Sequence, residues 1–171
     1  MGLACYIDVI LDRVACNAIA TTAHTDWFAG ERDLPALDPR QPLDALWSRQ
    51  VRGDGEDFVR AWAERLGKWL NAGVDGYYLQ GPQGLPPATW AKLLGTLRHM
   101  HPDARYIAAT QGMTPHDIEQ RTSSGFDWTV NSLPWWDGRA DWLAQEDGRL
   151  RALAPVLAPL GAQSGARSAG L

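Results

Sequence analysis

Short apolar runs alternate along the chain with longer stretches in which apolar residues recur at helical spacing. The runs span residues 5–11, 74–79, 104–109, 126–131 and 155–160, and each is typical of a strand in a parallel sheet. The first run, CYIDVIL, is predicted to be buried on both faces of that sheet. The helical spacing predicts helices over 58–71, 87–101 and 140–153, with a shorter helix capped by Thr114.

This alternation of strand and helix implies a parallel sheet with right-handed crossovers. Such a sheet is either doubly wound or part of a (β/α)8 barrel. No glycine-rich phosphate loop follows the first strand, so the dinucleotide-binding form of the doubly wound fold lacks its main residues. The long segment 15–55 also follows a strand, on the face where barrels carry their active-site loops. The sequence therefore predicts an α/β fold of the partial (β/α)8 TIM barrel type.

The predicted domain boundaries follow from composition. Residues 1–160 form the partial barrel domain, and residues 161–171 form a small polar tail. Segment 15–55 is rich in Pro, Asp and Gly and has weak periodicity, so we expect a long loop with at most a short helix around Leu43–Trp47.

Charge and cysteine content narrow the range of partners. The chain has 171 residues and a net charge of −4 without a basic stripe, so nucleic acid is not expected as a partner. No stretch approaches the roughly 20 apolar residues of a membrane span. Cys5 and Cys16 have neither zinc-site spacing nor a disulfide framework, and residues 1–14 do not resemble a signal peptide. These features predict a cytoplasmic address.

Four segments, in order and spacing, carry a family resemblance. They are VILDRVACN (9–17), AGVDGYYLQ (72–80), HPDARYIAATQG (101–112) and GFDWTVNSLPWWDGRADWL (125–143), and HTDWF (24–28) adds support. Together they resemble the third to sixth strands of the barrel of glycoside hydrolase family 13, the α-amylase-type enzymes. The closest likeness is to the maltosyltransferase branch, which extends α-glucan from maltose 1-phosphate. The resemblance implies that the chain covers about strands three to seven of eight.

The resemblance also implies what chemistry to look for. Active members use an Asp nucleophile after the fourth strand and a Glu acid/base after the fifth, about 5 to 5.5 Å apart. Gln80 and Ala109 occupy those positions here, and Tyr78 stands where the family has arginine. A looser match places the family's His-Asp pair near the seventh strand on Gln163 and Ser164. An amide and a methyl group neither attack an anomeric carbon nor shuttle its proton, so we expect no catalytic residues and no turnover.

Few acidic residues are in a position to replace the missing pair. Asp12 matches the family's first motif, although Cys16 and Asn17 replace the Asn-His that follows it in the family. Asp75 and Asp127 are expected near the amino ends of their strands, which is the wrong face of the barrel.

The predicted site therefore binds sugar at most. Its expected ligand contacts lie at the carboxyl ends of the strands and comprise Asp12, Tyr78, Gln80, Gln111, Asn131, Trp135 and Trp136. For Asp12 a structural carboxylate, and for the two Trp residues packing against the next helix, are equally good interpretations. No metal or cofactor is expected, because His24 and Asp26 lack a third ligand.

Three roles are compatible with this interpretation. The leading one is a degenerate maltosyltransferase-like domain that binds α-glucan or maltooligosaccharide, or supports an active partner. The alternative is an active maltosyltransferase or glycoside hydrolase that retains anomeric configuration through relocated carboxylates. The third is a scaffold that binds partners without sugar. A partial barrel has open strand edges, and three explanations are compatible with it: the chain is a fragment of a longer polypeptide, a partner chain or self-association completes the barrel, or the chain is a decayed gene product.

Overall fold

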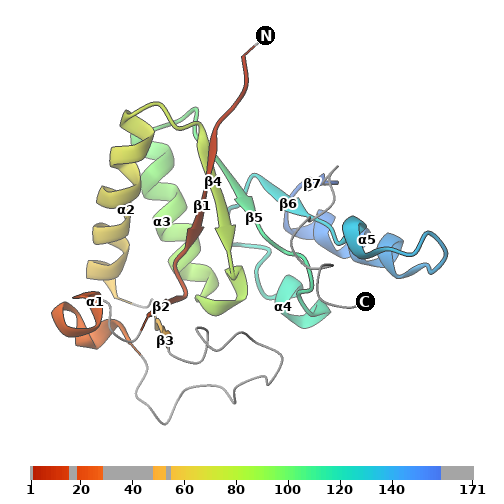
Figure 1. The fold of residues 1–171 in the computed structure, drawn as a ribbon, viewed down its shortest axis with the longest axis horizontal. Helices are drawn as coiled ribbons and strands as arrows, with labels where there is room; N and C mark the ends of the chain where they lie inside the picture. The colour runs from red at the N-terminus through yellow and green to blue at the C-terminus, as the bar shows by residue number, and fades with distance from the viewer. Residues whose placement is uncertain (1, 16–18, 29–47, 53–54, 159–171) are drawn as a thin grey trace, which may run out of the picture.

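The computed structural model describes residues 2–15, 19–28, 48–52 and 55–158. Its centre is a parallel sheet with the order β1-β4-β5-β6-β7 (Figure 1). The strands are β1 (Tyr6–Ile10), β4 (Gly76–Gln80), β5 (Arg105–Ala108), β6 (Trp128–Val130) and β7 (Val156–Leu157). All five lie within the apolar runs of the sequence or within one residue of them, which confirms the α/β prediction.

Helices connect successive strands, as expected for a barrel segment. They are α2 (Glu56–Asn71), α3 (Pro87–Met100), α4 (Pro115–Glu119) and α5 (Trp142–Leu153). Gly73 has a φ of 101°, which lets the chain leave α2 through a left-handed residue. Thr114 caps α4 by accepting a hydrogen bond from the Asp117 amide, as its sequence pattern predicts.

The segment between β1 and α2 contains more regular structure than the sequence indicates. A two-stranded antiparallel sheet pairs β2 (Arg13–Ala15) with β3 (Ser48–Gln50), and α1 (Ile19–Ala23) and the 3-10 helix η1 (Thr25–Trp27) lie between them in the sequence. The prediction of a simple loop is therefore wrong at both ends of the segment, where buried Phe28 and Val51 anchor the chain against the core. The expected helix around Leu43–Trp47 lies outside the described residues.

The main core lies between the sheet and the pair α2 and α3. Tyr77 and Tyr106 point from neighbouring strands into this core with their rings stacked, 6.5 Å between centroids. Trp90 on α3 is fully buried and donates from its indole nitrogen to the Pro82 carbonyl oxygen at 2.9 Å. The burial of such large side chains stabilises the packing of α2 and α3 against one face of the sheet.

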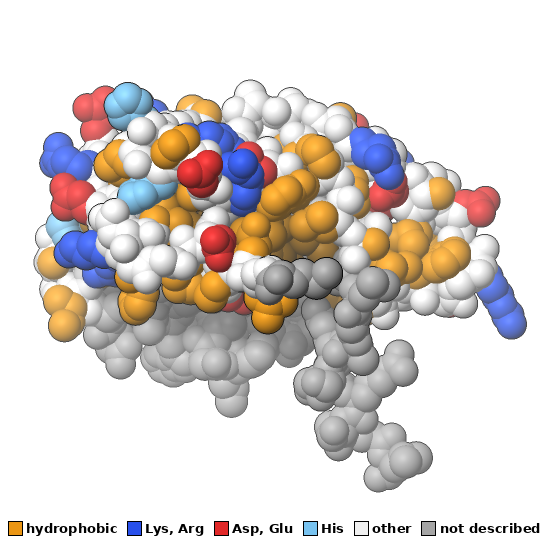
Figure 2. All heavy atoms as spheres, turned by 90° about the horizontal axis from the view of Figure 1, so that it is seen from above, with side chains coloured by type: hydrophobic (Ala, Val, Ile, Leu, Met, Phe, Trp, Pro, Cys, Tyr) orange, Lys and Arg blue, Asp and Glu red, His pale blue; other side chains and the backbone are white. Residues whose placement is uncertain are grey.

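The opposite face of the sheet is more open. The expectation that the first strand is buried on both faces is wrong, because Asp8 and Ile10 are exposed. The physical reason is the alternation of side chains along the strand: Ile7 and Val9 pack against the core, whereas Asp8 and Ile10 point to the opposite face of the sheet. Figure 2 shows the molecule from above relative to Figure 1, from the amino ends of the strands, with hydrophobic side chains in the middle of the view and charged groups around them.

In the part of the chain that the structure describes, no helix is both long enough and apolar enough to cross a bilayer.

Candidate functional site

The strands β1 and β4 bring an acidic and an amide side chain together, Asp8 from the middle of β1 and Gln80 from the carboxyl end of β4. Register pairs Asp8 with Tyr78 and Ile10 with Gln80. Asp8 and Gln80 are two positions apart in this register and share a face, so Gln80 reaches back along the sheet. Its Nε2 donates to Asp8 Oδ2 at 3.2 Å. The amide of Gln80, which the sequence resemblance places at the nucleophile position, is thus bonded to a neighbouring carboxylate.

Tyr78 links this pair to the turn that follows β5. Its hydroxyl donates to Gln111 Oε1 at 2.9 Å. Burial, and to a smaller extent the charge of Asp8, raises the pKa of Tyr78, so the phenol keeps its proton at neutral pH. Tyr78, Gln80 and Gln111 thus form one polar row with Asp8, a residue that the sequence analysis did not select.

Asp12 lies just past β1, packed beneath the turn that follows Gln80. Its side chain is so close to Gly81 and Gly84 that a Cβ atom added at Gly84 would lie 2.3 Å from Asp12 Cβ. Asp12 Oδ2 accepts from Arg13 Nη1 at 3.0 Å, and its buried Oδ1 has no hydrogen-bond partner among the described atoms. Burial raises the pKa of Asp12, and Arg13 opposes the rise. These contacts favour the structural interpretation of this carboxylate.

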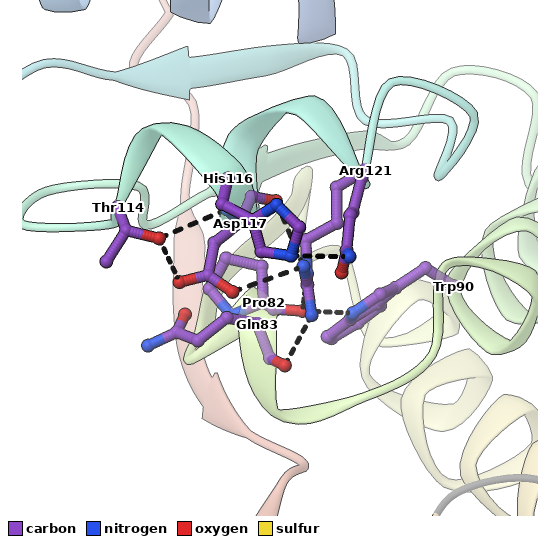
Figure 3. A network of polar contacts seen from close by, with 8 residues as sticks. Pro82, Gln83, Trp90, Thr114, His116, Asp117 and Arg121 are labelled. Atoms are coloured by element: carbon purple, nitrogen blue, oxygen red, sulfur yellow. Dashed lines mark hydrogen bonds and ion pairs between the residues drawn. The ribbon is translucent and has the colours of Figure 1, made fainter.

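A buried guanidinium holds that same turn from the other side (Figure 3). Arg121 is 5% exposed. Its Nε donates to the Pro82 carbonyl at 2.9 Å, and its Nη2 donates to the Gln83 carbonyl. Its Nη1 donates to the Asp117 carbonyl at 2.9 Å, within α4. The 3-10 turn η4 (Pro82–Gly84), which begins two residues after Gln80, is therefore fixed by a side chain from the β5–β6 connection.

Two exposed tryptophans follow β6 on the 3-10 helix η5 (Leu133–Trp135) and just beyond it. Trp135 is 54% exposed and Trp136 39% exposed. The Trp135 ring lies near Gly112, since a Cβ added there would be 3.8 Å from Trp135 Cζ3, so this ring is adjacent to the Gln111 turn. Trp136 instead donates from Nε1 to the Ala140 carbonyl at 2.7 Å, within its own loop.

Asn131 is the predicted ligand contact with the most internal bonding. It is buried, its Oδ1 accepts from the Leu133 amide at 3.3 Å, and its Nδ2 donates to Asp147 Oδ1 at 3.4 Å. The structure thus brings Tyr78, Gln80 and Gln111 together beside Trp135 but directs Asn131 toward α5.

The two acidic residues at the other end of the sheet lie where the sequence analysis places them. Asp75 Oδ2 accepts from the Cys5 amide at 2.6 Å. Asp127 Oδ2 accepts from the Tyr106 amide at 2.8 Å, and its other oxygen pairs with Arg98 at 3.0 Å. Both carboxylates are at the amino ends of strands. Gln163 and Ser164 lie outside the described residues.

Within the described ranges, no three His, Cys, Asp or Glu residues are grouped closely enough to hold a metal ion. The side chains described around Gln80 are the Asp8 carboxylate, the Gln111 amide and the Tyr78 ring.

Comparison with known proteins places the chain by sequence and by fold. No protein-family model matches the chain. The chain is 34% identical over 164 residues to the α-1,4-glucan:maltose-1-phosphate maltosyltransferase of Burkholderia pseudomallei (strain K96243). That alignment covers 92% of this chain and 14% of the relative, so the chain spans about a seventh of the relative's length.

Solved structures match the fold at low sequence identity. An α-amylase from Lactobacillus plantarum matches with a TM-score of 0.64 and 16% identity, over 86% of this chain and 39% of that enzyme. The cyclic α-maltosyl-(1→6)-maltose hydrolase of Arthrobacter globiformis, in complex with maltose, matches with a TM-score of 0.63 and 19% identity, over 94% and 42%. The chain is a member of the α-amylase-type glycoside hydrolases, family 13, and forms a segment of their barrel related to the maltosyltransferase branch.

Proposed function

We propose that this chain is a catalytically inactive α-amylase-type domain that binds α-glucan or maltooligosaccharide at the carboxyl ends of its strands. The observation that carries the proposal is the Gln80–Asp8 hydrogen bond at the nucleophile position. Gln80 cannot form a glycosyl ester, and Ala109 offers no proton at the acid/base position. Amides hydrogen-bond well to neutral hydroxyl groups, and the exposed Trp135 ring offers a stacking surface.

The loss of both groups weighs heavily against residual turnover. Removing one member of a catalytic set can cost about a millionfold in rate, and the rest of the rate comes from binding alone. The purified chain is expected to release no reducing sugar from glycogen and to elongate no maltooligosaccharide. Turnover that disappears on Asp8→Asn would contradict the proposal.

Binding is tested by calorimetric titration with maltoheptaose. Heat that saturates, and that falls when Gln80 or Trp135 is replaced by Ala, is the expected result. No heat up to roughly millimolar sugar, the weak end of ordinary affinities, would remove the binding proposal.

One observation favours the alternative of an active retaining enzyme with relocated carboxylates. Asp8 is an exposed carboxylate next to the nucleophile position. A retaining pair needs a second carboxyl about 5 to 5.5 Å away. Asp12, four residues further on, is about 13 Å away along an extended chain, and it is packed under a turn. The loss of turnover in Asp8→Asn, described above, is the result that would support this alternative.

We also propose that another polypeptide covers the open side of the sheet and completes the barrel. β1 and β7 are the ends of the sheet, and exposed Ile10 and Leu157 lie on these end strands. An open strand edge is a template for pairing with another chain. Sedimentation velocity distinguishes a second copy, which doubles the mass, from a different partner, which leaves the isolated chain monomeric.

The proposed compartment is the cytoplasm. Cys5 is exposed and unpaired, as suits a reducing environment. Cell fractionation with a tagged chain tests this directly.

A further inference from the structure

We propose that Asp8 is a positioning and specificity-determining residue, which orients the Gln80 amide so that the site accepts neutral sugar hydroxyls and disfavours phosphorylated sugars. This inference rests on the proposed function and adds the class of ligand. It concerns a residue that the family resemblance did not bring forward.

The first step is the direction of the Gln80 amide. A carboxylate at neutral pH has acceptor oxygens and no proton to donate. Its 3.2 Å contact with Gln80 therefore requires the NH2 end of the amide, which is the assignment that the structure has. Gln80 Oε1, on the other branch of the same planar group, is then turned away from Asp8 as an acceptor.

The second step is the surroundings of Gln80. Tyr78 lies opposite Asp8 in the strand register, and the Asp8 charge contributes to the raised pKa of Tyr78. The negative charge of Asp8 therefore acts on Tyr78 as well as on Gln80. The guanidinium of Arg13, which lies just beyond β1, forms its ion pair with Asp12.

The third step is the ligand chemistry. Asp8 and Gln80 Oε1 together present acceptor oxygens, which hydroxyl groups satisfy by donating. A phosphate group is anionic and brings mainly acceptors, so it would meet like charge and unpaired lone pairs. The arrangement selects the unphosphorylated end of an α-glucan over a sugar phosphate.

The binding test compares maltotriose with maltose 1-phosphate by calorimetry. The intact chain is expected to bind maltotriose at least about tenfold more tightly, a factor typical of one unmet polar contact. Asp8→Asn removes the charge and lets the Gln80 amide turn, so the preference should shrink toward equal affinities. Asp103→Asn is the matched control, because it removes one carboxylate from the exposed turn before β5, at the other end of the sheet. An unchanged preference in Asp8→Asn would overturn the inference.

A second measurement needs no ligand. The Gln80 side-chain amide protons, identified by their absence in Gln80→Ala, should shift in the NMR spectrum of Asp8→Asn and stay in place in Asp103→Asn. If the intact chain binds no sugar, the proposed function fails while this shift still supports the positioning role of Asp8. If the Gln80 signals do not move in Asp8→Asn, the positioning role fails even where sugar binds.

Discussion

The two ends of the sheet use acidic residues in opposite ways. At the amino ends, Asp75 and Asp127 accept hydrogen bonds from the backbone amides of Cys5 and Tyr106. Toward the carboxyl ends, exposed Asp8 in the middle of β1 bonds only to the side chain of Gln80, the last residue of β4, among the contacts described. Asp75 and Asp127 each bond to the backbone of a neighbouring segment of the sheet. Asp8 instead bonds to a half-buried side chain.

This difference shows what the chain has preserved. The carboxylates of Asp75 and Asp127 at the amino ends accept from backbone amides, and the loss of Asp127 would leave the part-buried Tyr106 amide unpaired. The positions that the family resemblance assigns to the nucleophile and the acid/base hold Gln80 and Ala109. The fold and the proposed loss of catalysis can therefore be tested separately.

The largest effect is expected from Asp127→Ala. The change leaves the Tyr106 amide unpaired and removes the partner of Arg98, which should lower the free energy of unfolding by about 2–3 kcal/mol. Urea denaturation measures the change. Gln80→Ala is the comparison at the opposite end and should cost less, under about 1 kcal/mol, because Gln80 is half-buried and the side-chain bond described for it is to exposed Asp8. Equal losses at both ends would remove the distinction.

A smaller effect, on binding, is expected from Trp135→Ala. Loss of one stacking ring should weaken maltoheptaose binding about tenfold, equivalent to roughly 1.4 kcal/mol. Trp69→Ala is the matched control, because Trp69 is 55% exposed on α2 and away from the polar row. The prediction fails if both variants weaken binding alike, since the sugar would then not recognise the Trp135 surface.

The smallest effect is expected from Asp12→Asn and depends on pH. Burial raises the folded-state pKa of Asp12 above 3.8, so the folded protein holds this proton more tightly than the unfolded chain. The contribution of Asp12 to stability should therefore fall as pH rises from about 3.8 through the raised folded pKa. Denaturation of both proteins across this window gives the difference. A difference that grows in favour of Asp12 with rising pH would mean that its bond with Arg13 outweighs burial.

Local patterns predicted the sheet and the ends at which its polar residues lie. The parallel strands follow from apolar runs between amphipathic helices, and parallel strands end at a common edge. Gln80 and Gln111 could therefore be placed together before the structure was known, as could Asp75 at the opposite end.

Contacts that depend on strand register or on distant pairing could not be predicted. Asp8 meets Gln80 only because β1 and β4 pair in one of several possible registers. The β2–β3 pair joins residues 13–15 to 48–50, across a separation whose closure no local signal encodes. Asn131 is predicted as a ligand contact from its place at the end of a strand. In the structure its Nδ2 donates to Asp147 on α5, a contact that the local sequence does not indicate.

The buried guanidinium of Arg121 limits how loops can be exchanged between members of this family. The turn after β4 is held in part by a residue about forty positions later in the sequence, because Arg121 donates to the Pro82 and Gln83 carbonyls. A graft that exchanges residues 80–85 alone would place a new turn against an unchanged Arg121, whose hydrogen bonds fit the original turn. Placing an acidic residue at position 80 together with a new turn would therefore call for a matching change at Arg121, just after α4.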